Sequence, residues 1–173
     1  MPEKEIVYKG KIFNVTHESV IDEDGTKHLI EKCSRPDVVT VIGLQEQQVL
    51  LINEFRSGSR KHVYWLPGGK VDEGELPKEA AKREFEEETR HSSQEYELFH
   101  TKYPSDTFTG NGYAFLAKNI KPAENIYTTP DEVGKISTEL IDIDEAINMT
   151  FEGIMPNEFF GYLLIKIRRD LFG

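Results

Sequence analysis

The sequence lacks several features that define common protein classes. It has a single cysteine, Cys33, in 173 residues, so no internal disulfide can form, as is typical of proteins from a reducing compartment. No apolar run is long enough to span a membrane, and the N-terminus, MPEKEIVYKGK, has no apolar signal segment. We therefore expect a soluble, cytoplasmic protein with no membrane partner, and we interpret Cys33 as a structural strand residue.

Basic residues are also scarce. The chain has 21 Lys and Arg against 31 Asp and Glu, a formal net charge of −10. Binding along a nucleic acid backbone needs clustered cations, so we expect no nucleic acid partner. A small anionic substrate remains compatible with this charge, because a bound metal ion can invert the local field.

The acidic residues concentrate in one stretch, residues 68–88, with the sequence GGKVDEGELPKEAAKREFEEE. We predict a loop followed by a helix from Pro77 to about Thr89, since proline is favoured in the first helical turn. Three carboxylates on this helix are spaced at i, i+3 and i+4 and share one arc of its surface: Glu84, Glu87 and Glu88. Ala81 and Phe85 lie beside that arc and predict a narrow apolar stripe.

Like charges at this spacing destabilise a helix by a few tenths of a kcal/mol per pair. One interpretation is an acidic helix face exposed to water. The other is a site for a divalent metal such as Mg²⁺, which prefers oxygen ligands and often bridges carboxylates to substrate phosphates. The spacing alone leaves both open.

The remaining chain predicts an α/β fold in which helices cover a mixed sheet. Apolar or alternating segments predict strands at 12–21, 28–33, 38–44, 49–55, 63–66, 96–103, 113–117 and 136–143, with helices at 144–151 and 157–171. Residues 104–112 and 128–134 are expected to be loops. The break at residues 35–37 predicts a β-hairpin extension over 1–36 and a main domain over 37–173.

The ordered context of the acidic helix resembles the Nudix box of the Nudix hydrolases, G-x5-E-x7-R-E-U-x-E-E-x-G-U, where U is a bulky apolar residue. Gly69 opens the match, Glu75 follows, and Arg83 begins the segment REFEEE. The box then departs from the pattern, because Arg90 and His91 replace its closing glycine and apolar residue. Since glycine normally ends such a helix in a left-handed conformation, we expect an altered or longer helix end.

Outside the box, the chain resembles the subgroup that cleaves ADP-ribose and nucleoside diphosphate sugars. The resemblance lies in YKGKIF (8–13), NEFR (53–56), the segment 103–117 and the segment 141–154. It implies a Nudix fold, an α/β/α sandwich with an N-terminal β extension, and a homodimer formed through that extension.

The resemblance also implies roles for individual residues. Glu84, Glu87 and Glu88, with the backbone carbonyl of Gly68, would bind Mg²⁺ or alternatively Mn²⁺. The ions would bridge the diphosphate and activate a water. Arg83 would orient Glu87 by a charge-assisted hydrogen bond.

The remaining candidate site residues lie in the box and in the segments before and after it. Glu132, beside Asp131, holds the place of the general base in that subgroup, and an ordinary acidic loop is the alternative. Arg56 and Glu54 are candidate substrate-binding residues. Arg56 could bind a phosphate or stack on the base of the substrate, and the alternative is a surface salt bridge. Glu75 would either tether the loop or favour the helix N-terminus as an acid.

These expectations combine into one function with two alternatives. The first is Mg²⁺-dependent hydrolysis of ADP-ribose or a nucleoside diphosphate sugar to a nucleoside monophosphate and a sugar phosphate. One alternative is hydrolysis of another nucleotide, either a nucleoside triphosphate or a dinucleoside polyphosphate. The other is a non-catalytic nucleotide-binding module, against which the three intact box glutamates argue.

Overall fold

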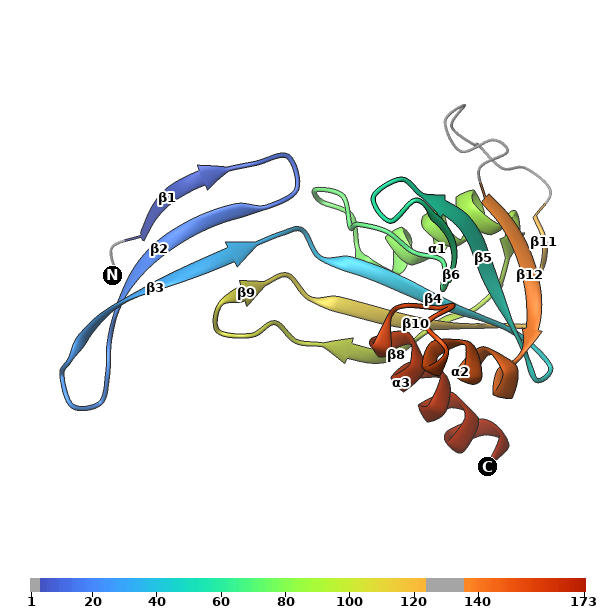
Figure 1. Cartoon of the computed structure of the whole chain (residues 1–173). Helices are drawn as coiled ribbons and strands as arrows, with labels where there is room; N and C mark the ends of the chain where they lie inside the picture. The colour runs from blue at the N-terminus through green and yellow to red at the C-terminus, as the bar shows by residue number, and fades with distance from the viewer. Residues whose placement is uncertain (1–3, 124–135) are drawn as a thin grey trace.

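The computed structural model describes residues 4–123 and 136–173, so Asp131 and Glu132 lie outside the described residues (Figure 1). Its centre is a six-stranded mixed sheet in the order β12-β5-β4-β10-β8, with β6 paired to β5. The strands are β4 (Val38–Gln45), β5 (Gln48–Arg56), β6 (Lys61–Trp65), β8 (Tyr96–Lys102), β10 (Gly112–Lys118) and β12 (Ile136–Asp142). These agree with the predicted strands to within a few residues.

The central strands are apolar on both faces because helices cover both faces. On β4, β5 and β10, neighbouring residues contribute to opposite cores, as Val41 and Ile42 do. Helix α1 (Pro77–Thr89) packs on one face through Ala80, Ala81 and Phe85. Helices α2 (Ile143–Phe151) and α3 (Glu158–Ile167) pack on the other. The predicted α/β/α sandwich is confirmed.

The two C-terminal helices begin at side-chain caps. Asp142 accepts a hydrogen bond from the backbone N–H of Asp144, and Asn157 accepts one from that of Phe159. Each cap pairs one of the backbone donors that a helix start leaves unpaired. Helix α3 continues into a π-helical turn, Arg168–Phe172, so the predicted helix at 157–171 is found with a wider last turn.

The N-terminal extension differs from the predicted hairpin because a third strand joins it. It contains β1 (Lys4–Lys9), β2 (Asn14–Ile21) and β3 (Lys27–Ser34), paired antiparallel in that order. In Figure 1 these strands project from the main sheet as an arm. The segment expected to be only a loop, 104–112, contains the short strand β9 (Phe108–Thr109), which pairs in parallel with β3.

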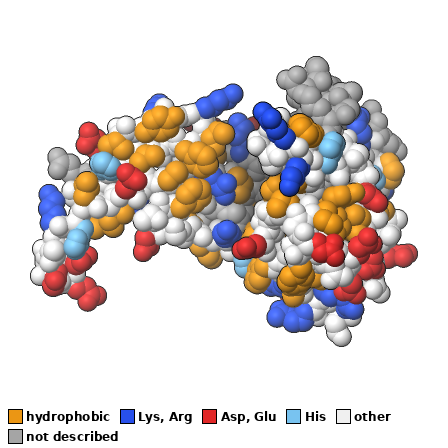
Figure 2. Space-filling view, viewed as in Figure 1, with side chains coloured by type: hydrophobic (Ala, Val, Ile, Leu, Met, Phe, Trp, Pro, Cys, Tyr) orange, Lys and Arg blue, Asp and Glu red, His pale blue; other side chains and the backbone are white. Residues whose placement is uncertain are grey.

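The arm carries many exposed apolar side chains. Figure 2 shows them gathered along its surface. On the arm, the large apolar residues that are at least 40% exposed are Ile6, Val7, Tyr8, Ile12, Phe13, Ile21 and Leu29. Contiguous apolar surface of this kind is typical of an interaction site.

The end of α1 corrects one expectation. The helix stops at Thr89, and Arg90 itself adopts the left-handed conformation, with φ 57° and ψ 28°, while its N–H bonds the carbonyl of Glu86. Arginine therefore takes the conformation expected of glycine, and the helix is neither longer nor altered in its exit. The chain passes directly into β7 (His91–Ser92), which pairs with β11 (Lys121–Pro122).

The length and apolar character of the helices decide whether any of them could cross a membrane. Within residues 4–123 and 136–173, no helix combines the length and the apolar character needed to cross a bilayer.

Candidate active site

Two glycines bring the start of the box against the sheet. The carbonyl oxygens of Pro67 and Gly69 accept hydrogen bonds of 2.8 Å from the N–H groups of Val41 and Val39 on β4. Gly68 lies between them with φ 152°, and a Cβ there would collide with the Val39 carbonyl oxygen. A Cβ on Gly69 would collide with the carboxylate of Glu84. Both positions need glycine because backbone and carboxylate approach so closely.

Glu88 is the box carboxylate that reaches this backbone. Its Oε2 accepts a hydrogen bond of 2.8 Å from the Gly68 N–H. Burial raises the pKa of Glu88 to about 8, the Gly68 hydrogen bond opposes that rise, and the charges of Glu84 and Glu54 add to it. The charged form of Glu88 is therefore disfavoured in the absence of a cation, and a cation bound beside it would lower its pKa again.

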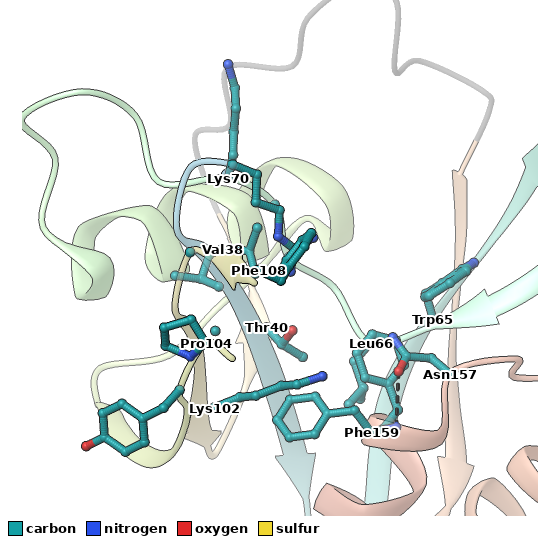
Figure 3. Close-up of a pocket in the computed structure, with 18 of the residues that line it drawn as sticks. Val38, Thr40, Trp65, Leu66, Lys70, Lys102, Pro104, Phe108, Asn157 and Phe159 are labelled. Carbon is teal, nitrogen blue, oxygen red and sulfur yellow. Dashed lines mark hydrogen bonds between the residues drawn. The ribbon is translucent and has the colours of Figure 1, made fainter. Parts of the chain in front are cut away.

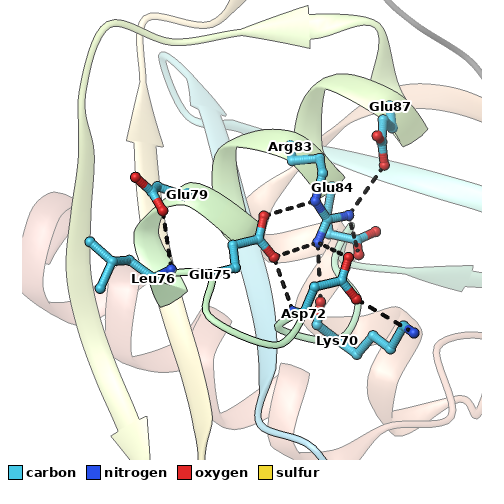
Figure 4. A network of polar contacts seen from close by, with 8 residues as sticks. All are labelled: Lys70, Asp72, Glu75, Leu76, Glu79, Arg83, Glu84 and Glu87. Carbon is cyan, nitrogen blue, oxygen red and sulfur yellow. Dashed lines mark hydrogen bonds and ion pairs between the residues drawn. The ribbon is translucent and has the colours of Figure 1, made fainter.

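Arg83 is the centre of a polar network that fastens the loop to the helix (Figure 4). Its guanidinium forms a bidentate pair with Glu75, at 2.9 and 2.8 Å, and also donates to the Lys70 carbonyl oxygen at 3.2 Å. Glu75 also accepts from the Asp72 N–H at 3.1 Å. These contacts make Glu75 a tether of the loop, and the N-cap position belongs to Leu76.

The same guanidinium reaches the box carboxylates. Its Nη1 donates to Glu84 at 2.8 Å and to Glu87 at 3.4 Å. The contact with Glu87 that the sequence suggested is therefore present, but Glu75 and Glu84 are the shorter partners. The hydrogen bond from Arg83 is the main cause that lowers the pKa of Glu75.

The box carboxylates suit a divalent cation in kind, because they are oxygen ligands with excess negative charge around a partly buried Glu88. In the described part of the chain, however, no three His, Cys, Asp or Glu side chains already converge into a metal site. Arg83 and the Gly68 N–H occupy oxygens of Glu84 and Glu88. Each of these hydrogen bonds is to one oxygen of its carboxylate. Because a carboxylate accepts at both oxygens, an ion can bind while the side chains keep these partners.

The Gly68 carbonyl is the remaining predicted ligand. Its neighbours, the carbonyls of Pro67 and Gly69, are both hydrogen-bonded to β4. The hydrogen bonds of the described residues include none to the Gly68 carbonyl. This oxygen is therefore not already engaged by the protein, as an additional ligand would need to be.

A cavity of about 600 Å³ adjoins the box (Figure 3). Gly68 and Gly69 form part of its wall, together with residues from β4, β6, the segment after β8 and the start of α3. Arg56 also lines it, stacked over the Trp65 ring at 4.7 Å from the ring centroid. Its Nε pairs with Glu54 at 2.8 Å, so Arg56 forms the predicted salt bridge and also lines the cavity.

The structure thus brings together most of the predicted site residues and adds others. Glu132 lies outside the described residues. Sequence reasoning missed two residues that line the cavity, Lys102 and Phe159. The Lys102 ammonium lies over the Phe159 ring, which also packs against the core. A helical apolar pattern does not distinguish a core residue from one at the edge of a cavity. Phe108 also lines the cavity.

Comparison with known proteins assigns the chain to a family. The family model described as NUDIX domain matches residues 34–156. The chain therefore belongs to the NUDIX family of pyrophosphohydrolases.

Individual relatives are distant. An ADP-ribose pyrophosphatase of Bacillus subtilis (strain 168) is 27% identical over 123 residues, which cover 70% of this chain and 66% of that protein. A methanol dehydrogenase activator of Bacillus methanolicus is 26% identical over 145 residues, 83% of this chain and 78% of that protein. A crystal structure of an ADP compounds hydrolase superposes with a TM-score of 0.77 at 18% identity, covering 95% of this chain and 92% of that one. The likeness to that structure supports the fold.

Proposed function

We propose that the protein hydrolyses the diphosphate bond of ADP-ribose or a related nucleoside diphosphate sugar, using Mg²⁺ or Mn²⁺. The products would be a nucleoside monophosphate and a sugar phosphate. One observation carries the proposal: Glu88 is held against the Gly68 backbone at the edge of a cavity large enough for a nucleotide. The similarity to an ADP-ribose pyrophosphatase supports the choice of substrate.

The ions would be held by Glu84, Glu87, Glu88 and the Gly68 carbonyl. When bound, they neutralise phosphate charge and supply an activated water. The chain's own part is to hold these oxygens in place. Arg83 does so for Glu84 and Glu87, while its bidentate pair with Glu75 fixes the guanidinium. Arg83 is thus a positioning residue in this scheme.

Arg56 and Glu54 are the proposed substrate-binding residues. The Trp65 ring and the Glu54 carboxylate hold the Arg56 guanidinium at the cavity wall. An arginine held in this way presents donors to a phosphate oxygen without losing much side-chain entropy on binding. Glu54 thereby orients the residue that contacts the substrate.

Glu132 is the proposed general base. The sequence places it four residues before β12, whose first residue, Ile136, pairs with Glu54 on β5. Glu132→Gln should lower kcat by about 10²–10⁴-fold, with Asp131→Asn as the matched control. A Glu132→Gln rate within a few-fold of wild type would place the base elsewhere.

A second copy of the chain is the proposed partner. The main-domain sheet is complete without the arm, whose exposed apolar side chains have no cover within the described chain. A homodimer formed through residues 1–36 would bury them.

Hydrolysis of a different nucleotide is the second candidate, and non-catalytic nucleotide binding is the third. The similarity to a protein named methanol dehydrogenase activator is a reason to test both. A panel of ADP-ribose, nucleotide sugars, diadenosine polyphosphates and nucleoside triphosphates, each with Mg²⁺, separates them. Fastest turnover of ADP-ribose or a nucleotide sugar is expected, whereas turnover of none would overturn the enzymatic proposal.

A further inference from the structure

The cavity beside the box has a charge opposite to that of the chain. Among the described residues that line the cavity there is no Asp or Glu. The chain as a whole has ten more acidic than basic residues. Four cationic side chains line it: Arg35, Arg56, Lys70 and Lys102. Such a wall favours an anionic ligand.

Two of these cations are already paired with carboxylates. Arg56 pairs with Glu54 at 2.8 Å, and Lys70 lies 3.5 Å from Asp72. Arg35 and Lys102 form no ion pair in the described part of the chain. The Nε of Arg35 is also buried without an acceptor, which normally costs free energy unless a ligand pairs it.

Aromatic rings hold the two unpaired cations. The Arg35 guanidinium lies 5.2 Å from the centroid of Phe108, and the Lys102 ammonium lies 5.1 Å from that of Phe159. A ring attracts a cation through its quadrupole. Unlike a carboxylate, it leaves the net charge in place and the N–H donors available. The cations are thus positioned but not neutralised.

The backbone places the two pairs on different sides of the cavity. Arg35 lies between β3 and β4, where its N–H bonds the Thr109 carbonyl beside Phe108. Lys102 ends β8, paired with Gly112 of β10. Figure 3 shows Phe108 near Lys70, and Phe159 with Lys102 across the cavity from them.

We propose that Arg35 and Lys102 bind a phosphate group additional to the scissile diphosphate, so that the preferred substrate is a nucleoside diphosphate sugar that also carries a phosphomonoester. This inference rests on the proposed function, because it assigns the diphosphate to the metal-binding carboxylates. Charge there is balanced by the ions, which leaves Arg35 and Lys102 to pair with a further anion.

Binding of a matched pair of ligands tests the inference without turnover. ADP-ribose and ADP-ribose 2′-phosphate differ by one phosphomonoester, and calorimetry in Mg²⁺ with the non-hydrolysable α,β-methylene analogue of each measures both affinities. We expect wild type to bind the phosphorylated ligand at least tenfold more tightly. Lys102→Gln and Arg35→Gln should each remove part of that preference, and the double variant should remove it while binding ADP-ribose as wild type does.

Two control variants separate charge from packing. Lys102→Arg keeps the charge and should keep the preference. Lys166 also lies over a ring, Phe99 at 4.0 Å, but it pairs with Asp170 at 2.9 Å and does not line the cavity, so Lys166→Gln should change nothing. Equal affinity of wild type for both ligands, or a preference that survives in Lys102→Gln, would overturn the inference. Loss of turnover on the nucleotide panel would instead count against the proposed function.

Discussion

The carboxylate of Glu88 accepts a hydrogen bond from the backbone N–H of Gly68, 20 residues earlier in the chain, at 2.8 Å. The contact joins the C-terminal part of helix α1 to the loop that opens the box. Two of the proposed metal ligands, the Glu88 carboxylate and the Gly68 backbone, therefore lie next to each other. Burial and neighbouring acids raise the pKa of Glu88, so a cation bound at this contact would favour the charged carboxylate.

The Arg83–Glu75 pair should stabilise the loop at neutral pH. Glu75→Gln is expected to lower the free energy of unfolding by about 1–2 kcal/mol at pH 7, because a charge-assisted bidentate pair is lost. Arg83 lowers the folded-state pKa of Glu75. Its stabilisation is therefore present above the unfolded pKa and is lost as pH falls through the folded pKa.

Urea titrations of wild type and Glu75→Gln from pH 7 into the acid range measure this effect. The difference between the two proteins should shrink as pH falls below 4.5, the ordinary value for this carboxyl. Glu73→Gln in the same loop is the control and should match wild type. A Glu75→Gln protein as stable as Glu73→Gln at pH 7 would rule out the tether.

Arg90 in the left-handed conformation should be strained by its Cβ. Arg90→Gly and Arg90→Ala both remove the side chain's other contacts, so their difference isolates the Cβ. The glycine variant should be more stable than the alanine variant by about 1 kcal/mol, measured by thermal or urea unfolding. Equal stabilities would mean that the helix end is not left-handed in solution.

The exposed face of the arm should hold two copies together. Ile6 and Tyr8 are 62% and 60% exposed on β1. Analytical ultracentrifugation should show a dimer for wild type and a monomer for the double variant Ile6→Asp, Tyr8→Asp. Leu98→Asp, at another exposed apolar position, 52% exposed on β8, should remain dimeric. A monomeric wild type would contradict this assembly.

The sequence allowed the sheet and helices to be predicted because their signals are local. Val41 and Ile42, adjacent and both apolar, indicate a strand covered on both faces, and Pro77 marks the start of α1. The helix end could not be predicted, because a missing glycine does not show that Arg90 will adopt the same conformation. Strand β9 escaped prediction because it has two residues and pairs with β3, which is distant in the sequence.

The site could be predicted only where its residues lie close together in the sequence. The box glutamates lie on one helix, so their spacing placed them together. The cationic cavity is different: Arg35, Lys102 and Phe159 come from three distant segments, and only the tertiary fold brings them to one wall. The same holds for Arg83, whose main partner is Glu75 and not the residue four positions along the helix.

The rate of ADP-ribose hydrolysis with Mg²⁺ tests the central claim most directly, measured for wild type, Glu88→Gln and Glu86→Gln. Glu86 lies on the same helix and pairs loosely with Lys82 at 4.0 Å, so its variant controls for a change of charge on α1. We predict Mg²⁺-dependent turnover that chelation abolishes. It should fall by ~10²-fold or more in Glu88→Gln and stay near the wild-type rate in Glu86→Gln. Turnover that persists in chelator, or that is equal in wild type and Glu88→Gln, would contradict the account.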